Sequence, residues 1–203
     1  FMDYSAPIDK KILKKNIIRH RLEKKYPENN TTEAIEPIIY YLDPGTPEPI
    51  MTALIDGAMW WNEAFESIGF IDAFQVKILP ENVDPMDCRY NVIQWVHRST
   101  RGWSYGSSVT DPRTGEIIKG HVSLGSLRVR QDYLIGQSLI ENPYLPQNKE
   151  KVLEMSLARI RQLSAHEVGH TLGFAHNFSS STKQRSSVMD YPHPLIKIKD
   201  DKI

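Results

Sequence analysis

Near its C-terminal end the chain reads His166-Glu167-Val168-Gly169-His170-Thr171-Leu172-Gly173-Phe174-Ala175-His176. Residues four apart on an α-helix lie on nearly the same face, one turn apart. His166 and His170 can therefore direct both imidazoles at one ion, and a catalytic zinc takes three protein ligands and keeps one position open. Glu167 is offset around the helix, where a carboxylate can act as a general base on water beside the metal without binding it.

The third histidine of this stretch requires a break in the helix. In an unbroken helix His176 would lie about 9 Å beyond His170 along the axis, whereas zinc–nitrogen bonds are only about 2 Å long. Gly173 stands between them and can adopt a positive φ at little steric cost, as glycines at helix C-termini do. The spacing therefore predicts that the chain turns back at Gly173 and brings His176 to the same ion.

A second motif, Ser187-Val188-Met189-Asp190-Tyr191, follows shortly downstream. Together the two motifs resemble the metzincin clan of zinc endopeptidases. The resemblance implies one catalytic Zn²⁺ held by His166, His170 and His176, with Glu167 as the catalytic base. It also implies that Met189 lies in a tight turn beneath the zinc site. In astacin-like and serralysin-like members a tyrosine at the position of Tyr191 approaches the metal or the developing oxyanion.

The residue after the third histidine is Asn177, which differs from the residue usual in the best-known metzincin subfamilies. The residues of the two motifs, together with the stretches 60–70 and 111–117, resemble a large family of bacterial zinc-dependent metalloproteases of the Bacteroidetes, EcxA-like type more than those subfamilies. This resemblance runs from about residue 35 to residue 194. It implies a secreted, periplasmic or cell-surface protein, and we expect the chain to be a catalytic fragment cut from a longer precursor.

Composition excludes several other classes of protein. The chain has 203 residues, with 25 basic and 25 acidic side chains and a formal net charge of zero. A balanced charge gives no general attraction to nucleic acid or anionic membranes, and no apolar run is long enough to span a bilayer. Cys88 is the single cysteine, so an internal disulfide is impossible.

Hydrophobic patterning predicts an α+β protein whose upper subdomain is of the α/β type. We expect strands over 35–42, 73–79 and 91–97, a long backing helix over 48–68 closed by Gly69, and an active-site helix over 152–172. Strand, helix and strand of these lengths favour parallel pairing. The resemblance implies a metzincin-like zincin with a twisted mixed sheet and a short lower subdomain.

A hairpin is expected from two further strands, 107–111 and 116–124, joined by the turn 112–115. An edge strand here would leave backbone donors and acceptors free, so a substrate peptide could bind as an additional extended strand. We divide the chain into a basic N-terminal segment, 1–34, and a catalytic domain, 35–203. The upper subdomain covers about 35–176 and the lower about 177–203.

Two other functions are compatible with parts of the sequence. The first is a catalytically silent, zinc-containing peptide-binding module of the same fold. The second is a nucleic-acid or surface-binding protein that uses the basic residues between 9 and 25, a segment whose apolar spacing suits a short helix or a docked strand. The intact metal motif favours the zinc endopeptidase over both.

Overall fold

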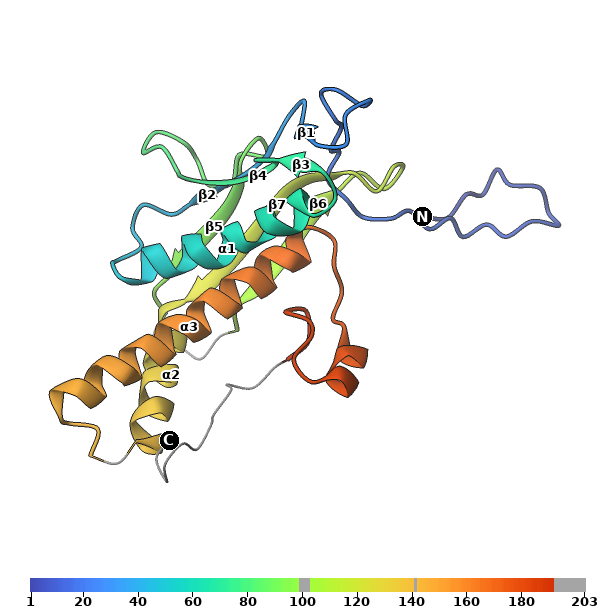
Figure 1. The fold of residues 1–203 in the computed structure, drawn as a ribbon. Coiled ribbons are helices and arrows are strands. Elements are labelled where there is room, and N and C mark those ends of the chain that lie inside the picture. Colours follow the sequence, from blue (N-terminus) through green and yellow to red (C-terminus); the bar gives the residue numbers. More distant parts are fainter. Residues whose placement is uncertain (99–102, 141, 192–203) are drawn as a thin grey trace.

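The computed structural model describes residues 1–98, 103–140 and 142–191, and a five-stranded mixed sheet forms its centre (Figure 1). The strands lie in the order β4-β2-β5-β7-β6. Their bounds are β2 (Ile38–Leu42), β4 (Phe74–Ile78), β5 (Asn91–Val96), β6 (Tyr105–Thr110) and β7 (Ile117–Gly125). Strands β4, β2, β5 and β7 run parallel to one another, and β6 pairs antiparallel with β7. Strand β6 is therefore one edge of the sheet.

Two long helices, α1 (Ile50–Glu66) and α3 (Pro146–Thr171), lie side by side against one face of the sheet (Figure 1). They approach closely at Gly57, where a Cβ would stand 2.2 Å from the carbonyl oxygen of Arg161. Polar side chains also tie the two backbones together. The Ser164 hydroxyl donates to the Leu54 carbonyl at 2.7 Å, deep in the interface. These contacts with α1 thus fix the position of α3 along its axis and its rotation about that axis.

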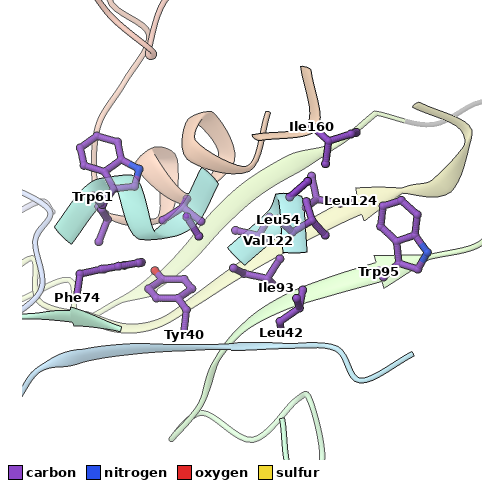
Figure 2. Packing of buried hydrophobic residues seen from close by; sticks show 14 of the residues in the cluster. Tyr40, Leu42, Leu54, Trp61, Phe74, Ile93, Trp95, Val122, Leu124 and Ile160 are labelled. Carbon is purple, nitrogen blue, oxygen red and sulfur yellow. The ribbon is translucent and has the colours of Figure 1, made fainter. Parts of the chain in front are cut away.

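The core fills the space between these helices and the sheet (Figure 2). Its members are almost completely buried, and the largest include Tyr40, Phe74, Leu54, Ile93 and Ile160. They come from β2, β4, α1, β5 and α3 respectively, so every layer contributes. Truncating one such side chain to alanine typically costs about 2–5 kcal/mol.

The smaller elements surround this framework. They are a two-stranded parallel sheet of β1 (Thr32–Glu33) and β3 (Phe70–Ile71), helix α2 (Ser126–Leu139) and the 3₁₀ helix η1 (Phe178–Lys183). None of the helices within the described ranges has the length and apolarity to cross a membrane. Helix α2 follows β7 directly and packs near the first half of α3 (Figure 1).

The predicted fold class is confirmed: a mixed sheet carries a long backing helix and the helix that holds the histidine motif. The predicted strands, hairpin and parallel pairings are present, and no bound of a strand is shifted by more than three residues. Helix α3 begins at Pro146 rather than 152, because a proline suits the first position of a helix. Helix α2 was not predicted. The division of the chain into domains stays a prediction, and residues 192–203 of the expected lower subdomain lie outside the described residues.

The expectation of a helix or a regular strand within residues 9–25 is wrong. This segment is extended and makes only isolated bridges, among them Arg19 with Glu116 and Lys24 with Ala34. The Arg19 backbone bonds both Gly115 and Ile117 at the end of the hairpin, but the pairing does not continue. Arg19 and Glu116 thus form a single parallel bridge and not a ladder.

His20 connects this segment to the core. Its ring lies against Tyr40, whose hydroxyl donates to the Thr171 hydroxyl at 2.8 Å. Burial lowers the pKa of His20 to about 4, because the desolvated ring resists protonation. In an unfolded chain a histidine takes up a proton near pH 6.5. Since the unfolded state binds the proton first, the free energy of unfolding should fall as pH drops from about 6.5 to 4.

We predict that His20→Gln weakens this acid sensitivity. Denaturant unfolding of the metal-free protein at pH 7.5 and 4.5 should show a smaller loss of stability in the variant, by about 1–3 kcal/mol. His97→Gln removes an exposed histidine and should leave the difference unchanged. An equal loss in wild-type protein and His20→Gln would contradict the prediction.

Candidate metal centre

The first two histidines of the motif lie on adjacent turns of α3 and meet at their Nε2 atoms. The Nε2 atoms of His166 and His170 are 3.1 Å apart. Each ring is oriented by a carbonyl on its other side: His166 Nδ1 lies 2.7 Å from the Val188 oxygen, and His170 Nδ1 lies 2.9 Å from the Phe174 oxygen. A carbonyl only accepts, so each Nδ1 carries the proton and each Nε2 presents its lone pair.

The chain reversal after α3 occurs at Gly173, as the sequence predicted. Gly173 has a φ of +100°. Its N–H bonds the His170 carbonyl, and the Phe174 N–H bonds the Gly169 carbonyl, both at 3.1 Å. This pair of bonds is the Schellman arrangement, which satisfies the last carbonyls of a helix and turns the chain. The reversal places His176 Nε2 3.1 Å from His170 Nε2.

The three rings fit a zinc ion. Their metal-binding nitrogens all lie within 4.8 Å of one another, and no other group of three or more metal-binding side chains occurs among the described residues. Tetrahedral zinc with bonds of about 2.0–2.1 Å needs ligand nitrogens about 3.3–3.4 Å apart. The observed separations of 3.1 Å are close to that value.

Protonation also favours metal binding. Burial lowers the pKa of His166 below its ordinary value, and the neighbouring imidazoles of His170 and His176 lower it further. The pKa of His176 is also lowered, through desolvation and then through His170. Neutral imidazole is the form that binds a metal.

Glu167 points from the same helix toward edge strand β6. It is buried, and burial raises the pKa of its carboxyl to about 7, against the opposite influence of a hydrogen bond from the Gly106 backbone N–H. A Cβ on Gly106 would stand 2.1 Å from the Glu167 carbonyl oxygen and 3.2 Å from His170 Cβ. Strand β6 can therefore lie against α3 only because residue 106 is glycine.

Met189 lies beneath the centre, as the family resemblance implied. It is buried in the core, and its neighbour Val188 provides the carbonyl that orients His166. The Met189 carbonyl accepts from the Asn177 N–H at 2.9 Å, directly after the third histidine. One turn of chain thus orients the first histidine and holds the segment that carries the last.

Tyr191 lies beside the histidine cluster. Its ring centroid is 4.5 Å from that of His176 and 5.6 Å from that of His166, and the side chain is largely exposed. All five residues of the predicted site are therefore brought together, with His170 at the centre of the three rings. Their roles in binding and catalysis stay predictions.

Two contributors were missed by the sequence analysis. The Asp190 carboxylate is buried and accepts hydrogen bonds from the hydroxyls of Ser180 and Ser181, which pins η1 to the turn at Met189. The Ser181 hydroxyl and then the Tyr191 N–H hold the pKa of Asp190 below its usual range. The Ser-rich composition of 179–187 was interpreted only as a loop, and the spacing of hydroxyls to a distant carboxylate gives no periodic pattern.

Trp61 is the second contributor that the sequence analysis missed. Its indole N–H donates to the Ala165 carbonyl at 2.8 Å, and its ring stacks on Phe174 with centroids 5.1 Å apart. A backing-helix tryptophan thus holds both the motif helix and the reversal beyond it. A Cβ on Gly169 would lie 2.6 Å from Trp61 Cζ2 and 2.3 Å from Met189 Sδ.

We predict that Gly169→Ala destabilises the protein. Helix propensity alone would favour alanine by about 1 kcal/mol, but the methyl group overlaps a methionine that can move and a tryptophan that is held by its hydrogen bond. The expected result is a net loss of about 1–3 kcal/mol in unfolding free energy and weaker zinc binding. Gly125→Ala is the control, because no atom lies within 4 Å of its Cβ position. Unchanged stability and zinc affinity in Gly169→Ala would contradict this packing argument.

The comparison with protein families agrees with the motif. No curated protein matches the chain. A solved structure, archaemetzincin from Methanopyrus kandleri, is similar at 17% identity and a TM-score of 0.35, over 77% of this chain and 81% of that chain. A family model described as Met-zincin matches residues 148–203, which include the histidine triad and the methionine turn. This match supports a metzincin-type zincin and, at that level, a zinc metallopeptidase.

Proposed function

We propose that this chain is a zinc-dependent endopeptidase. The observation that carries the proposal is the meeting of three imidazole Nε2 atoms next to a buried carboxylate, in a cleft that runs beside a free sheet edge. The cleft has a volume of about 1130 Å³ and is lined by β6, the first turn of α2 and the motif face of α3. An extended peptide fits such a site better than a small metabolite does.

The substrate would bind along β6. Antiparallel pairing with β7 occupies one side of this strand, and no other strand of the described chain pairs with its outer side. A peptide added there would form backbone hydrogen bonds regardless of its sequence, and its side chains would alternate between the cleft and solvent. Gly106 would bring the peptide backbone close to Glu167 and the histidines.

Zinc bound by the three histidines would polarise the scissile carbonyl and lower the pKa of water toward about 7. Glu167 would take the water proton and deliver it to the leaving amine, a role that suits a carboxyl whose pKa lies near neutrality. The Tyr191 hydroxyl would donate to the oxygen that develops negative charge, since Tyr191 lines the cleft and its ring centroid lies 4.5 Å from that of His176.

The assignment to a particular metalloprotease family and to a cellular location is also a proposal. The wording of the motif, with Asn177 after the third histidine, supports the bacterial EcxA-like family. That family would make this an exported protease with a secreted, periplasmic or cell-surface location. The balanced net charge gives no support for a nucleic-acid partner.

We predict that Glu167→Gln abolishes peptide cleavage without loss of fold or zinc. Glutamine keeps the shape and can still accept from the Gly106 N–H, but it cannot take a proton. Cleavage of a quenched peptide library should fall by at least about 100-fold, with unchanged zinc content and thermal unfolding. Glu150→Gln, on the exposed face of the same helix, is the matched control.

Chelator treatment completes this test. Wild-type cleavage should stop on chelation and return when zinc is restored. Peptide binding without any chelator-sensitive cleavage would instead favour a silent peptide-binding module. Full activity in Glu167→Gln would remove the glutamate from the mechanism.

A further inference from the structure

The cleft has an apolar wall at the end where α3 terminates. Ile18, Gly173, Phe174 and Ala175 all line the cleft there, and none of them carries a polar side chain. Ile18 is 45% exposed and Phe174 is 51% exposed, so both present apolar surface to the cleft. Neither side chain has a part in holding the metal or in the proposed transfer of protons. Exposed apolar surface within a binding cleft is typical of a site for an apolar group of the ligand.

Ile18 reaches this wall from the basic N-terminal segment, far in sequence from the histidine motif. It belongs to residues 16–21, which we call the strap. A Cβ on Gly173 would stand 2.3 Å from the Ile18 carbonyl oxygen and 3.4 Å from Ile18 Cγ2. The strap can therefore lie directly against the chain reversal only because residue 173 has no side chain, and this contact brings Ile18 to the cleft.

The strap is held on both sides of Ile18. Before it, the Asn16 side chain donates to the Pro112 carbonyl at 3.1 Å. Directly after it, the Arg19 N–H donates to the Gly115 carbonyl at 3.1 Å. Both carbonyls belong to the turn of the β6–β7 hairpin. Because the backbone of Ile18 is fixed between these bonds, little conformational freedom would be lost when its side chain contacts a ligand.

Phe174 is fixed as well. Its ring stacks on that of Trp61 with centroids 5.1 Å apart and an interplanar angle of 11°. One face of the ring is thus covered, while about half of the residue remains exposed in the cleft. Trp61 is held in turn by its hydrogen bond to the Ala165 carbonyl. The two apolar side chains of the wall are therefore positioned before any ligand arrives.

Strand β6 leads from the metal centre toward the wall. Gly106 lies against the Glu167 carbonyl. Ser108, two residues further along, pairs with Gly120, whose Cβ position is 3.1 Å from Thr171 Cβ. The strand thus advances along α3 toward its C-terminal end. A helix rises about 1.5 Å and an extended peptide about 3.3 Å per residue, so the wall lies within about three residues of the metal centre for a peptide of either direction.

We propose that Ile18 and Phe174 form a subsite for one large apolar side chain of the substrate, within about three residues of the cleaved bond. This inference rests on the proposed endopeptidase function. A leucine or phenylalanine side chain placed against these two residues would leave water, which favours binding. Backbone pairing along β6 would accept many sequences, whereas this subsite would select among them by a side chain.

The test uses zinc-loaded Glu167→Gln protein, in which turnover is blocked, and short fluorescent peptides of serine and glutamine. One peptide carries a single leucine at its centre, and its matched partner carries glutamine there. A single apolar residue can reach the subsite in either direction of the peptide, so the comparison is independent of that direction. Fluorescence anisotropy should show about tenfold tighter binding of the leucine peptide.

Substitutions in the same background assign this preference to the strap. Ile18→Ser should reduce the preference for leucine at least about threefold, and Ile18→Glu should replace it with a preference for a matched lysine peptide. Ile17→Ser is the control and should keep the preference, because Ile17 is 78% exposed on the same strap and does not line the cleft. A purely structural role of Ile18 would weaken all peptides equally and leave their ratio unchanged.

The outcomes separate this inference from the proposed function. Equal binding of leucine and glutamine peptides, no binding of either, an equal loss of preference in Ile17→Ser, or a leucine preference that survives in Ile18→Ser and Ile18→Glu would overturn the subsite. The wild-type protein is offered the same peptides and a quenched peptide library. A preference that depends on Ile18, without any cleavage, would retain the subsite and contradict the endopeptidase, whereas cleavage without preference would do the reverse.

Discussion

The reversal of the chain at Gly173 is the constraint on which the rest of the site depends. A helix can supply two imidazoles to one ion, but the third must come back from beyond its end, and only a left-handed residue turns the chain within so short a span. The carbonyl of Phe174, just after the turn, also orients the ring of His170. The same few residues therefore close the helix, orient the ring of His170 and bring His176 back to it.

That reversal is held in place by elements far away in sequence. Trp61 from the backing helix stacks on Phe174 and bonds the Ala165 carbonyl, while the turn at Met189 orients His166 and bonds Asn177. At Gly169 the side chains of Trp61 and Met189 both pack against α3. The geometry of the three histidines therefore depends on the packed core and not on the motif alone. The two glycines of the motif therefore serve different purposes. Gly173 provides the positive φ of the turn, and Gly169 leaves room for the side chains of Trp61 and Met189.

Much of this could be predicted from the sequence because the informative patterns were local. Histidine spacing, the glycine and the alternation of the strands each depend on a single helix or hairpin. Helix α2 was missed because its apolar residues, such as Leu127, Val129 and Leu134, do not form a clear stripe, and Leu134 remains exposed. The prediction for the basic N-terminal segment was wrong because its lysines and isoleucines suggested a regular element, whereas its backbone bonds go to separate places, among them Phe1, Glu33 and the hairpin end at Gly115 and Ile117. The role of the Asp190 carboxylate was also beyond sequence reasoning, since only the folded chain brings it to the hydroxyls of Ser180 and Ser181.

The most direct test of the central claim is X-ray absorption spectroscopy of the zinc-loaded protein, combined with metal analysis. The account predicts about one zinc per chain with three imidazole nitrogens at about 2.0–2.1 Å, and the loss of one imidazole from this set in His176→Ala. A protein that binds no zinc, or one whose zinc spectrum is unchanged in His176→Ala, would contradict the claim that the turn at Gly173 completes the site.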